Sequence, residues 1–424
     1  MSTAAKQPAP QTGADLLVKS LEAQGVEYIF GIPGAKIDKV FDTLLDSRIK
    51  TVVCRHEQNA AFIAAGIGRM TGKAGVALVT SGPGCSNLVT GLATANSEGD
   101  PLVAIGGAVA TADRLKQIHQ SMDTVFRPIT KFSAEIDSPD SVSEVITNAF
   151  RSAESGRPGA AFVSAPKDIM AGTARGDVLT PAAPGILGPA DTDAISSAAL
   201  LISNAKQPVL LLGLLGSRPC AAQAIRGFLA KTKLPVVCTY QGAGVVPREL
   251  FDRFGSRVGL FHTPPADRLR DSADLVLAVG YNPIEYEPGL WNHDKHRHLI
   301  HVDVVPADID KDYRPQLELT GNIAATIEQL VTRLDGGELP ANSALLAEIV
   351  QDRAIFAQRE AALNGAPIHP MRLVKELQML LSDDMTLCLD MGSFHIWLAR
   401  YLYSFRPRQI LMTNGQQTLG VGLP

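Results

Sequence analysis

Short apolar runs alternate with segments of helical spacing along most of this chain, and this alternation limits the folds that it can adopt. Between Gly13 and Asp168 the expected strands are EYIFGI, TVVC, GVALVTS, PLVAIGGAV and GAAFVSA. The segments between them, such as Lys36 to Asp46 and Ser86 to Asn96, carry apolar residues at helical spacing. Strands that alternate with helices form parallel sheets covered on both faces. The sequence therefore predicts an α/β fold.

The chain divides where this periodicity is lost. Residues 172–189, GTARGDVLTPAAPGILGP, are rich in Gly, Pro and Ala and have the composition of a linker. A chain of 424 residues is also too long for one core. We therefore expect three consecutive parallel-sheet α/β domains, of which the third is incomplete. The expected segments are a first domain at 13–170, a linker at 171–190, a central domain at 191–340, a connector at 341–368, and the start of a third domain at 369–424.

The last segment is too short to bury a core of its own. It contains one expected helix, HPMRLVKELQMLLSDD, one strand, MTLCLDMG, and a second helix, SFHIWLARYLYSF. Either it packs on the rest of the chain, or the 424 residues are a truncated copy of a longer protein.

Composition narrows the classes of partner and compartment. Lys and Arg number 39 against 43 acidic residues, for a formal charge of −4 without a long basic run, which argues against nucleic acid. No signal peptide and no run of about 20 apolar residues is found, so we expect a soluble, cytoplasmic protein without a membrane partner. The cysteines form no Cys-x-x-Cys pair, which argues against a disulfide framework or a zinc site. All five are expected to be small buried side chains: Cys54, Cys85, Cys220, Cys238 and Cys388.

Three segments of the first domain deserve inspection because each follows an expected strand. They are GIPGAKID at 31–38, RHEQN at 55–59 and SGPGCSN at 81–87. In open parallel sheets, ligands bind beyond the carboxyl ends of the strands. A glycine loop that opens a helix can present free N–H groups to an anion, but it can equally be a tight turn. Both interpretations stay open for the two glycine loops.

Glu57 stands at the start of a helix whose body, Ala60 to Ile67, is apolar on every side and is therefore expected to be buried. A carboxylate in a first helical turn can simply be favoured by the helix dipole. Alternatively, Glu57 is a buried acid that holds or passes a proton near neutral pH. The residues alone do not decide between these interpretations.

The central domain has no dinucleotide-binding fingerprint. Gly213 with Gly216, and Gly242 with Gly244, have the wrong spacing for Gly-x-Gly-x-x-Gly after a strand. Asp303 follows an expected strand, but without those glycines we expect a solvated loop acid. The tract HDKHRHLIH at 293–301 mixes Lys and Arg among its histidines, so an exposed turn is favoured over a metal site.

Several long phrases together resemble the catabolic, FAD-independent acetolactate synthases, which are thiamine-diphosphate-dependent enzymes. They are FGIPGAKIDKVFDTLLDS, RHEQNAAFIAAGIGRMTGKAGVALVTSGPGCSNLVTGLATANSEGDP, HQSMDTV, VGLF, GYNPIEYEP, DMGSFHIWLARYLYSF and NGQQTLGVGLP. The resemblance covers nearly the whole chain from Gly13 onward. It implies three domains of the thiamine-diphosphate enzyme type, with the pyrimidine ring of the cofactor bound by the first and its diphosphate by the third.

The resemblance also implies a reaction. Two pyruvates condense to 2-acetolactate with loss of CO2, through a thiamine-bound hydroxyethyl carbanion. The glutamate that matches Glu57 hydrogen-bonds N1′ of the aminopyrimidine and so promotes loss of the proton from thiazolium C2. The apolar helix next to it keeps the site dry. The implied cofactors are thiamine diphosphate and Mg²⁺, and no FAD is expected because the central phrases are of the catabolic type.

Further residue roles follow from the same resemblance. Gln120 corresponds to a glutamine near the reacting carbon, and Lys36 is the candidate for holding the pyruvate carboxylate, although a solvated lysine is an equal alternative. The residues that flank the aminopyrimidine reach the cofactor of a partner subunit, so a homodimer or homotetramer with shared sites is implied: Pro33, Gly82 and Asn87. The diphosphate cradle and the segment that props the bent cofactor are matched by Gly392, Ser393, His395, Gln416, Gln417 and Leu419.

One part of the family pattern falls outside these 424 residues. The family holds its Mg²⁺ with a Gly-Asp-Gly segment and a downstream Asn that would follow Pro424, so no metal ligand is predicted in this chain. We expect the 424 residues alone to bind the cofactor poorly. The alternatives are an inactive truncated product that acts only as a dimerising or binding protein, and another thiamine-diphosphate carboligase such as glyoxylate carboligase or sulfoacetaldehyde acetyltransferase.

Overall fold

The computed structural model describes residues 10–116, 122–182, 185–259, 264–334 and 337–423. The chain forms two compact units, Met1–Gly185 and Ile186–Leu423. Each unit contains one six-stranded parallel sheet, and the second unit also contains a small two-stranded sheet. The predicted α/β class is confirmed, whereas the boundaries of the predicted three-domain division stay a prediction.

The first unit has the strand order β2-β1-β3-β4-β6-β5. Every residue of β3, β4 and β6 is buried, as continuous apolar runs predict for the middle of a parallel sheet. β5 was not predicted because its sequence, FSAE, has no apolar run. The strands are β1 (Tyr28–Ile32), β2 (Lys50–Val53), β3 (Gly75–Val79), β4 (Leu102–Ala108), β5 (Phe132–Glu135) and β6 (Ala160–Pro166).

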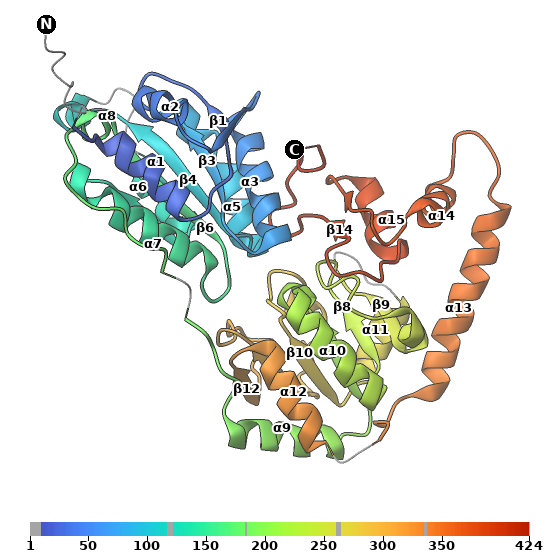
Figure 1. The fold of residues 1–424 in the computed structure, drawn as a ribbon. Coiled ribbons are helices and arrows are strands. Elements are labelled where there is room, and N and C mark those ends of the chain that lie inside the picture. Colours follow the sequence, from blue (N-terminus) through green and yellow to red (C-terminus); the bar gives the residue numbers. More distant parts are fainter. Residues whose placement is uncertain (1–9, 117–121, 183–184, 260–263, 335–336, 424) are drawn as a thin grey trace, which may run out of the picture. The chain divides into compact units, whose positions relative to one another are not determined.

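Helices cover both faces of this sheet (Figure 1). On one face, α1 and α7 share a hydrophobic core with strand residues such as Leu78. On the other face, α3 and α5 share a second core with the alternate strand residues, such as Val79. The long helices are α1 (Gly13–Ala23), α3 (Glu57–Thr71), α5 (Val89–Glu98) and α7 (Val142–Glu154). The shorter helices are α2 (Asp38–Leu44), α4 (Pro83–Ser86), α6 (Asp123–Phe126) and α8 (Lys167–Ala171).

α3 is less completely buried than the sequence predicts. Most of its body is buried, but Ile63 and Ile67 are half-buried, so the expectation of burial on every side is wrong for one face. Arg69 near its end lies in a buried ion group with Glu98 (3.2 Å) and Asp100 (2.8 Å). These contacts join α3 to the end of α5, and because all three charges are buried, removing Arg69 would leave two buried carboxylates without this cation.

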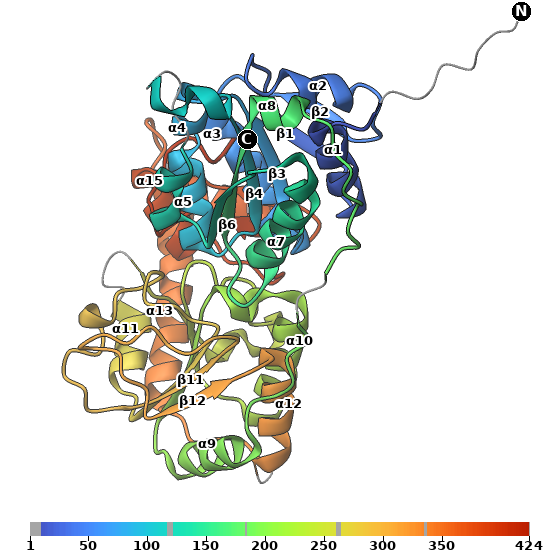
Figure 2. The same cartoon turned by 90° about the vertical axis from the view of Figure 1, so that its left-hand side faces the viewer.

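The sheet of the second unit has the order β12-β11-β10-β7-β8-β9. Helices α9, α10 and α12 share the core on one face, and α11 shares the core on the other face with the start of α13 (Figure 2). The strands are β7 (Pro208–Leu212), β8 (Val236–Cys238), β9 (Phe254–Arg257), β10 (Leu275–Val279), β11 (His298–Asp303) and β12 (Leu317–Thr320). The helices are α9 (Thr192–Asn204), α10 (Pro219–Thr232), α11 (Pro264–Asp271), α12 (Ile323–Arg333) and α13 (Ser343–Ala362).

Residues 369–423 pack on this central sheet, as expected for a segment too short for its own core. Their small core includes Tyr240, which follows β8, and Arg257 of β9 donates from Nη1 to the Ala399 carbonyl at 2.5 Å. The segment contains α14 (Pro370–Leu380), β13 (Leu387–Cys388), α15 (Ser393–Tyr401) and β14 (Ile410–Leu411), and its two strands pair in parallel.

Asp303, the cysteines and the histidine tract differ in part from what the sequence predicts. Asp303 is buried at the end of β11, where the expectation of a solvated acid is wrong because β12 continues the sheet beside it. Cys85 and Cys238 are buried, Cys54 is half-buried, and Cys220 and Cys388 are exposed, so the prediction of five buried cysteines is confirmed only for Cys85 and Cys238. Of the tract at 293–301, the histidines up to His298 are exposed as predicted, but His301 is buried in β11, where the expectation of an exposed turn is wrong. Among the helices described, none has the length and apolarity needed to cross a bilayer.

Candidate active site

The three candidate ligand-binding segments of the first unit follow β1, β2 and β3, which are neighbours in the sheet. They are residues 31–38, 55–59 and 81–87. Glu57 is the first residue of α3 and is only 8% exposed. The helix is capped by His56, whose Nδ1 accepts the N–H of Gln58 at 3.1 Å. Because His56 supplies the cap, the Glu57 carboxyl group is left for other contacts.

Asn87 fixes one oxygen of Glu57. Its Nδ2 donates to Glu57 Oε2 at 2.9 Å, and this bond joins the loop after β3 to the start of α3. Asn87 ends the short helix α4, which Gly82 opens with a φ of 58°, a value that favours glycine. The structure therefore brings Glu57, Gly82 and Asn87 together at one edge of the sheet.

Glycines keep the space beside the other oxygen clear. A Cβ on Gly84 would lie 3.4 Å from Glu57 Oε1 and 2.9 Å from Thr80 Cγ2. A Cβ on Gly34 would lie 2.5 Å from Thr80 Cβ, so the loop that contains Pro33 approaches Thr80 at Gly34. Thr80 was not singled out from the sequence. The available signal was its place, directly after β3 and before the Gly-Pro-Gly loop.

Cys85 lies in the same loop, and its thiol is not a nucleophile. Burial raises the pKa of Cys85 to about 12, and the charge of Glu57 acts in the same direction. The Sγ atom lies 3.2 Å from the Thr80 carbonyl oxygen. A buried, protonated thiol in this place helps to exclude water from the surroundings of Glu57.

Lys36 is half-buried in the loop after β1. The loop is held by Lys167, whose Nζ donates to the Ala35 carbonyl at 2.9 Å and contacts Asp38 at 3.3 Å. Within the described residues, no carboxylate pairs with the Lys36 ammonium group. Gln120, the other predicted catalytic residue, lies outside the described residues.

The remaining predicted residues belong to the second unit. Gly392 and Ser393 open α15 after β13, and the exposed residues Gln416, Gln417 and Leu419 follow β14, the strand paired with β13. Asp390 connects the two loops, because its Oδ1 accepts the Gly420 N–H at 2.8 Å.

His395 does not share this exposed edge. Its side chain is fully buried, and its ring nitrogens lie against Met391 Sδ (3.2 Å) and Met412 Sδ (3.1 Å). The structure thus places five of the six predicted residues of the second unit at one edge and His395 beneath it. In the described part of the chain, no group of three or more His, Cys, Asp and Glu side chains could hold a metal ion.

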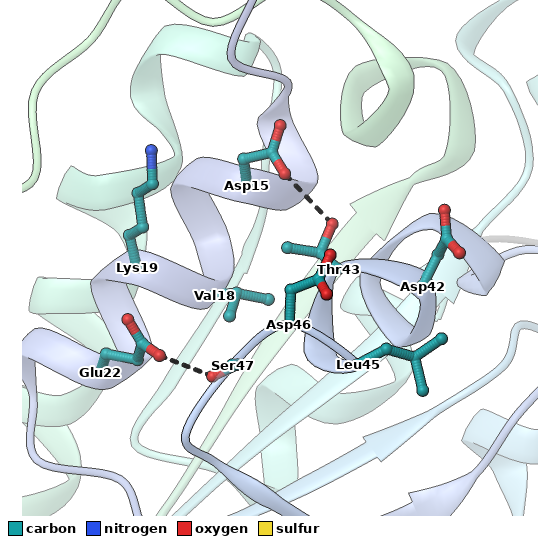
Figure 3. Close-up of a pocket in the computed structure, with 9 residues that line it drawn as sticks. All are labelled: Asp15, Val18, Lys19, Glu22, Asp42, Thr43, Leu45, Asp46 and Ser47. Carbon is teal, nitrogen blue, oxygen red and sulfur yellow. Dashed lines mark hydrogen bonds between the residues drawn. The ribbon is translucent and has the colours of Figure 1, made fainter. Parts of the chain in front are cut away.

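A surface pocket of about 430 Å³ lies elsewhere in the first unit, between α1 and α2. Figure 3 shows that four of its nine lining side chains are acidic, with Asp15 and Glu22 bonded to Thr43 (3.3 Å) and Ser47 (2.6 Å). It contains none of the predicted site residues.

Comparison with known proteins identifies the family. Residues 11–126 match the thiamine pyrophosphate enzyme N-terminal TPP-binding domain, and residues 195–330 match the central domain of the same enzymes. The catabolic acetolactate synthase of Raoultella terrigena is 53% identical over 97% of this chain and 74% of its own length. The chain belongs to the acetolactate synthase family. The acetolactate synthase of Bacillus subtilis (strain 168) is 48% identical over 97% of the chain and 73% of its own length.

Family membership extends to more distant relatives. The large subunit of acetolactate synthase isozyme 2 of Escherichia coli (strain K12) is 32% identical over 97% of the chain. The domain that binds thiamine pyrophosphate in this family comprises β1, β2, β3 and the loops after them, including Glu57. Thiamine diphosphate is therefore the cofactor to test against the geometry.

Proposed function

We propose that this protein is an acetolactate synthase, which condenses two pyruvates to 2-acetolactate and CO2. The single observation that carries the proposal is Glu57: a buried carboxyl group at the start of a largely apolar helix, held by Asn87 within the domain that matches the cofactor-binding family model. A solvated first-turn charge would need neither burial nor a dedicated amide partner.

The residues present fit the pyrimidine end of thiamine diphosphate. One oxygen of Glu57 is occupied by Asn87, and the other is next to Gly84, where a side chain would intrude. This arrangement leaves one carboxyl oxygen for a flat heterocyclic ring whose nitrogen can share a proton with it. When bound, thiamine diphosphate supplies an acidic carbon and an electron sink for decarboxylation.

The chain's own residues then have defined tasks. Glu57 holds and passes a proton at its free oxygen, and Asn87 keeps the carboxyl group in one orientation. Pro33 and Gly82 flank the ring, and the buried Cys85 and α3 exclude water. Lys36 supplies a cation for the pyruvate carboxylate, and Gln120 is proposed to lie near the reacting carbon.

For the diphosphate we propose the loops after β13 and β14. The free N–H groups at the start of α15, at Gly392 and Ser393, suit an anion. Gln416, Gln417 and Leu419 are exposed at the same edge and are available to contact the cofactor. We propose that His395 stabilises the start of α15 by packing and does not contact the cofactor directly, because its ring is buried between Met391 and Met412.

The proposed assembly is a homo-oligomer, at least a dimer, with active sites shared between subunits. β2 supports this proposal because it is an edge strand that ends shortly before Glu57 and leaves Val53 64% exposed. A cytoplasmic location is also proposed.

The deciding experiment compares Glu57→Gln with Glu144→Gln in the natural protein, supplied with pyruvate, thiamine diphosphate and Mg²⁺. Glu144 is a matched control because it is an exposed acid in the first turn of α7. Loss of a proton-transfer group costs about 10²–10⁴-fold in rate. We expect acetolactate formation to fall by about 100-fold or more in Glu57→Gln and to be unchanged in Glu144→Gln. An unchanged rate in Glu57→Gln would refute the proposed role.

A further inference from the structure

The central sheet has the strand order of a doubly wound fold. Its order reverses between β7 and β10, and such sheets bind nucleotides at this switch point. The phosphates of the nucleotide normally accept N–H groups from the loop after the first strand. That loop here begins at Gly213, directly after β7.

The two loops at the switch point close on each other. Gly213 N–H donates to the Val279 carbonyl and Leu215 N–H to the Gly280 carbonyl, both at 3.0 Å. A Cβ on Gly213 would lie 2.4 Å from the Gly280 oxygen, and a Cβ on Gly280 would lie 2.2 Å from the Gly216 nitrogen. Backbone packed this closely leaves no room between the loops for a phosphate chain.

The Glu285 carboxylate accepts hydrogen bonds from the groups that would otherwise donate to a phosphate. It is 3% exposed, and its Oε2 accepts the Leu214 N–H at 2.8 Å and the Thr239 hydroxyl at 2.7 Å. Its Oε1 accepts the Asn282 N–H at 3.1 Å. These three donors follow β7, β8 and β10, so one carboxylate joins all three loops of the switch point. Several hydrogen-bond donors around a buried carboxyl group favour its charged form.

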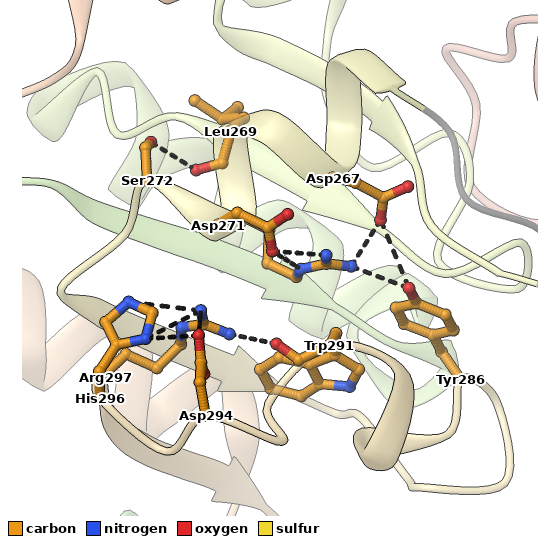
Figure 4. A network of polar contacts seen from close by, with 10 residues as sticks. Asp267, Leu269, Asp271, Ser272, Tyr286, Trp291, Asp294, His296 and Arg297 are labelled. Carbon is orange, nitrogen blue, oxygen red and sulfur yellow. Dashed lines mark hydrogen bonds and ion pairs between the residues drawn. The ribbon is translucent and has the colours of Figure 1, made fainter.

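The loop that carries Glu285 is itself held firmly. Figure 4 shows the neighbouring Tyr286, whose hydroxyl accepts from Arg270 Nη1 at 2.8 Å, next to Asp267. The Tyr281 hydroxyl donates to the Tyr286 carbonyl. Burial raises the pKa of Tyr286 to about 12, so this hydroxyl keeps its proton. The position of the Glu285 carboxylate is therefore set by the loop around it.

Glu285 also connects the switch point to the segment after β14. Its backbone carbonyl accepts Asn414 Nδ2 at 2.9 Å. Asn414 lies two residues before Gln416, the first residue of the proposed cofactor-propping segment. The region that binds a nucleotide in other doubly wound sheets thus anchors a segment of the same chain.

We propose that Glu285 is an internal anion that replaces a nucleotide phosphate at the switch point of the central sheet, closing this sheet to FAD and to nucleoside diphosphates. The proposal concerns the central unit alone and does not depend on the acetolactate synthase activity. The residues present at this switch point therefore do not fit FAD.

The first test titrates the wild-type protein with FAD, followed by fluorescence, and with ADP, followed by calorimetry. We expect no saturable binding of either.

The second test compares the melting temperatures of Glu285→Ala, Glu285→Gln and the control Glu287→Ala, which alters an exposed acid of the same loop. We expect Glu287→Ala to melt like the wild type and both Glu285 variants to melt lower, by about 5 °C or more, because all three donors lose their acceptor in Glu285→Ala and the amide nitrogen replaces one of the two acceptor oxygens in Glu285→Gln.

Inorganic phosphate is the decisive probe of the vacated position. In Glu285→Ala it should recover part of the lost melting temperature, whereas sodium chloride of equal ionic strength should not, and phosphate should have no such effect on the wild type or Glu287→Ala. Saturable FAD or ADP binding by the wild type would overturn the proposal. So would a soluble Glu285→Ala without phosphate-specific recovery. If Glu285→Ala does not fold, an unchanged melting temperature of Glu285→Gln overturns it, and a lowered one supports it.

Discussion

At the residue scale, Asn87 holds one oxygen of Glu57, and the proposed site uses the other oxygen to contact the cofactor. We predict that Asn87→Ala lowers kcat of acetolactate formation about tenfold, the worth of one hydrogen bond to a charged group. Asn87→Asp should be worse, since it places a second carboxylate against Glu57 and should move the acid limb of the pH–rate profile to higher pH. Steady-state kinetics across pH measures both effects.

The control for this series is Asn148→Ala, which alters an exposed asparagine of α7. Its kinetics should match the wild type. If Asn87→Asp were as active as the wild type at every pH, Asn87 would have no part in orienting Glu57.

Gly84 permits a second prediction, because the contact of an added methyl group is known. In Gly84→Ala the new Cβ would meet Thr80 Cγ2 at 2.9 Å, next to Glu57 Oε1. We expect a loss of activity of about tenfold or more, since one methyl group cannot be accommodated without a shift of the loop. Thr80→Ser removes Cγ2, so the double variant should recover part of the loss. Activities of the two single variants and the double variant form a cycle, and simple additivity would contradict the predicted contact.

At the scale of single elements, β11 carries a buried histidine that makes stability depend on pH. His301 is 2% exposed, its Nδ1 lies 3.0 Å from the Tyr313 hydroxyl, and burial lowers the pKa of His301 below its usual value of 6.5. The unfolded chain therefore binds a proton near pH 6.5 that the folded chain excludes. Stability is fully present above that pH and declines below it, with a slope of up to about 1.4 kcal/mol per pH unit.

The measurement is urea unfolding of the natural protein between pH 7.5 and about pH 5, within the ordinary range of histidine titration. His301→Gln should lose this component of the acid slope, because glutamine does not titrate there. His298→Gln, at an exposed position of the same strand, should keep it. Equal slopes for all three proteins would show that His301 titrates alike in both states.

At the scale of the whole molecule, the two compact units are joined by a linker whose two halves differ. Arg175 and Gly176 donate their N–H groups to Asp140, and Leu179 N–H donates to Ser143 at 2.8 Å, so this half is bound to the first unit. Ile186 is 99% exposed. We predict that thermolysin, which cuts before apolar residues, divides the native protein at Ile186 rather than at Leu179.

Mass spectrometry of the fragments locates the cut. Replacing Ile186 and the adjacent Leu187 by Asp should slow the cleavage without changing the melting temperature, because neither side chain is buried. A first cut at Leu179 would mean that the bonds to Asp140 and Ser143 do not protect this half.

The sequence predicts the middle of each sheet well and its margins poorly. β3 and β10 are apolar runs that any burial argument finds, whereas β9 and β12 are recognised only once a neighbouring strand lies beside them. Glu57 was singled out because an acid next to an apolar helix is unusual. The roles of Thr80 and Glu285 depend on close approaches between loops far apart in the sequence, and no local pattern encodes such approaches.

Tyr240 gives the small core of residues 369–423 a large side chain from a sheet that precedes it in the chain by more than a hundred positions. A ribosome therefore delivers the central sheet complete before the residues that rest on it emerge. Residues 369–423 therefore fold against a sheet that is already complete when they leave the exit tunnel. Their folding depends on that sheet and does not occur independently.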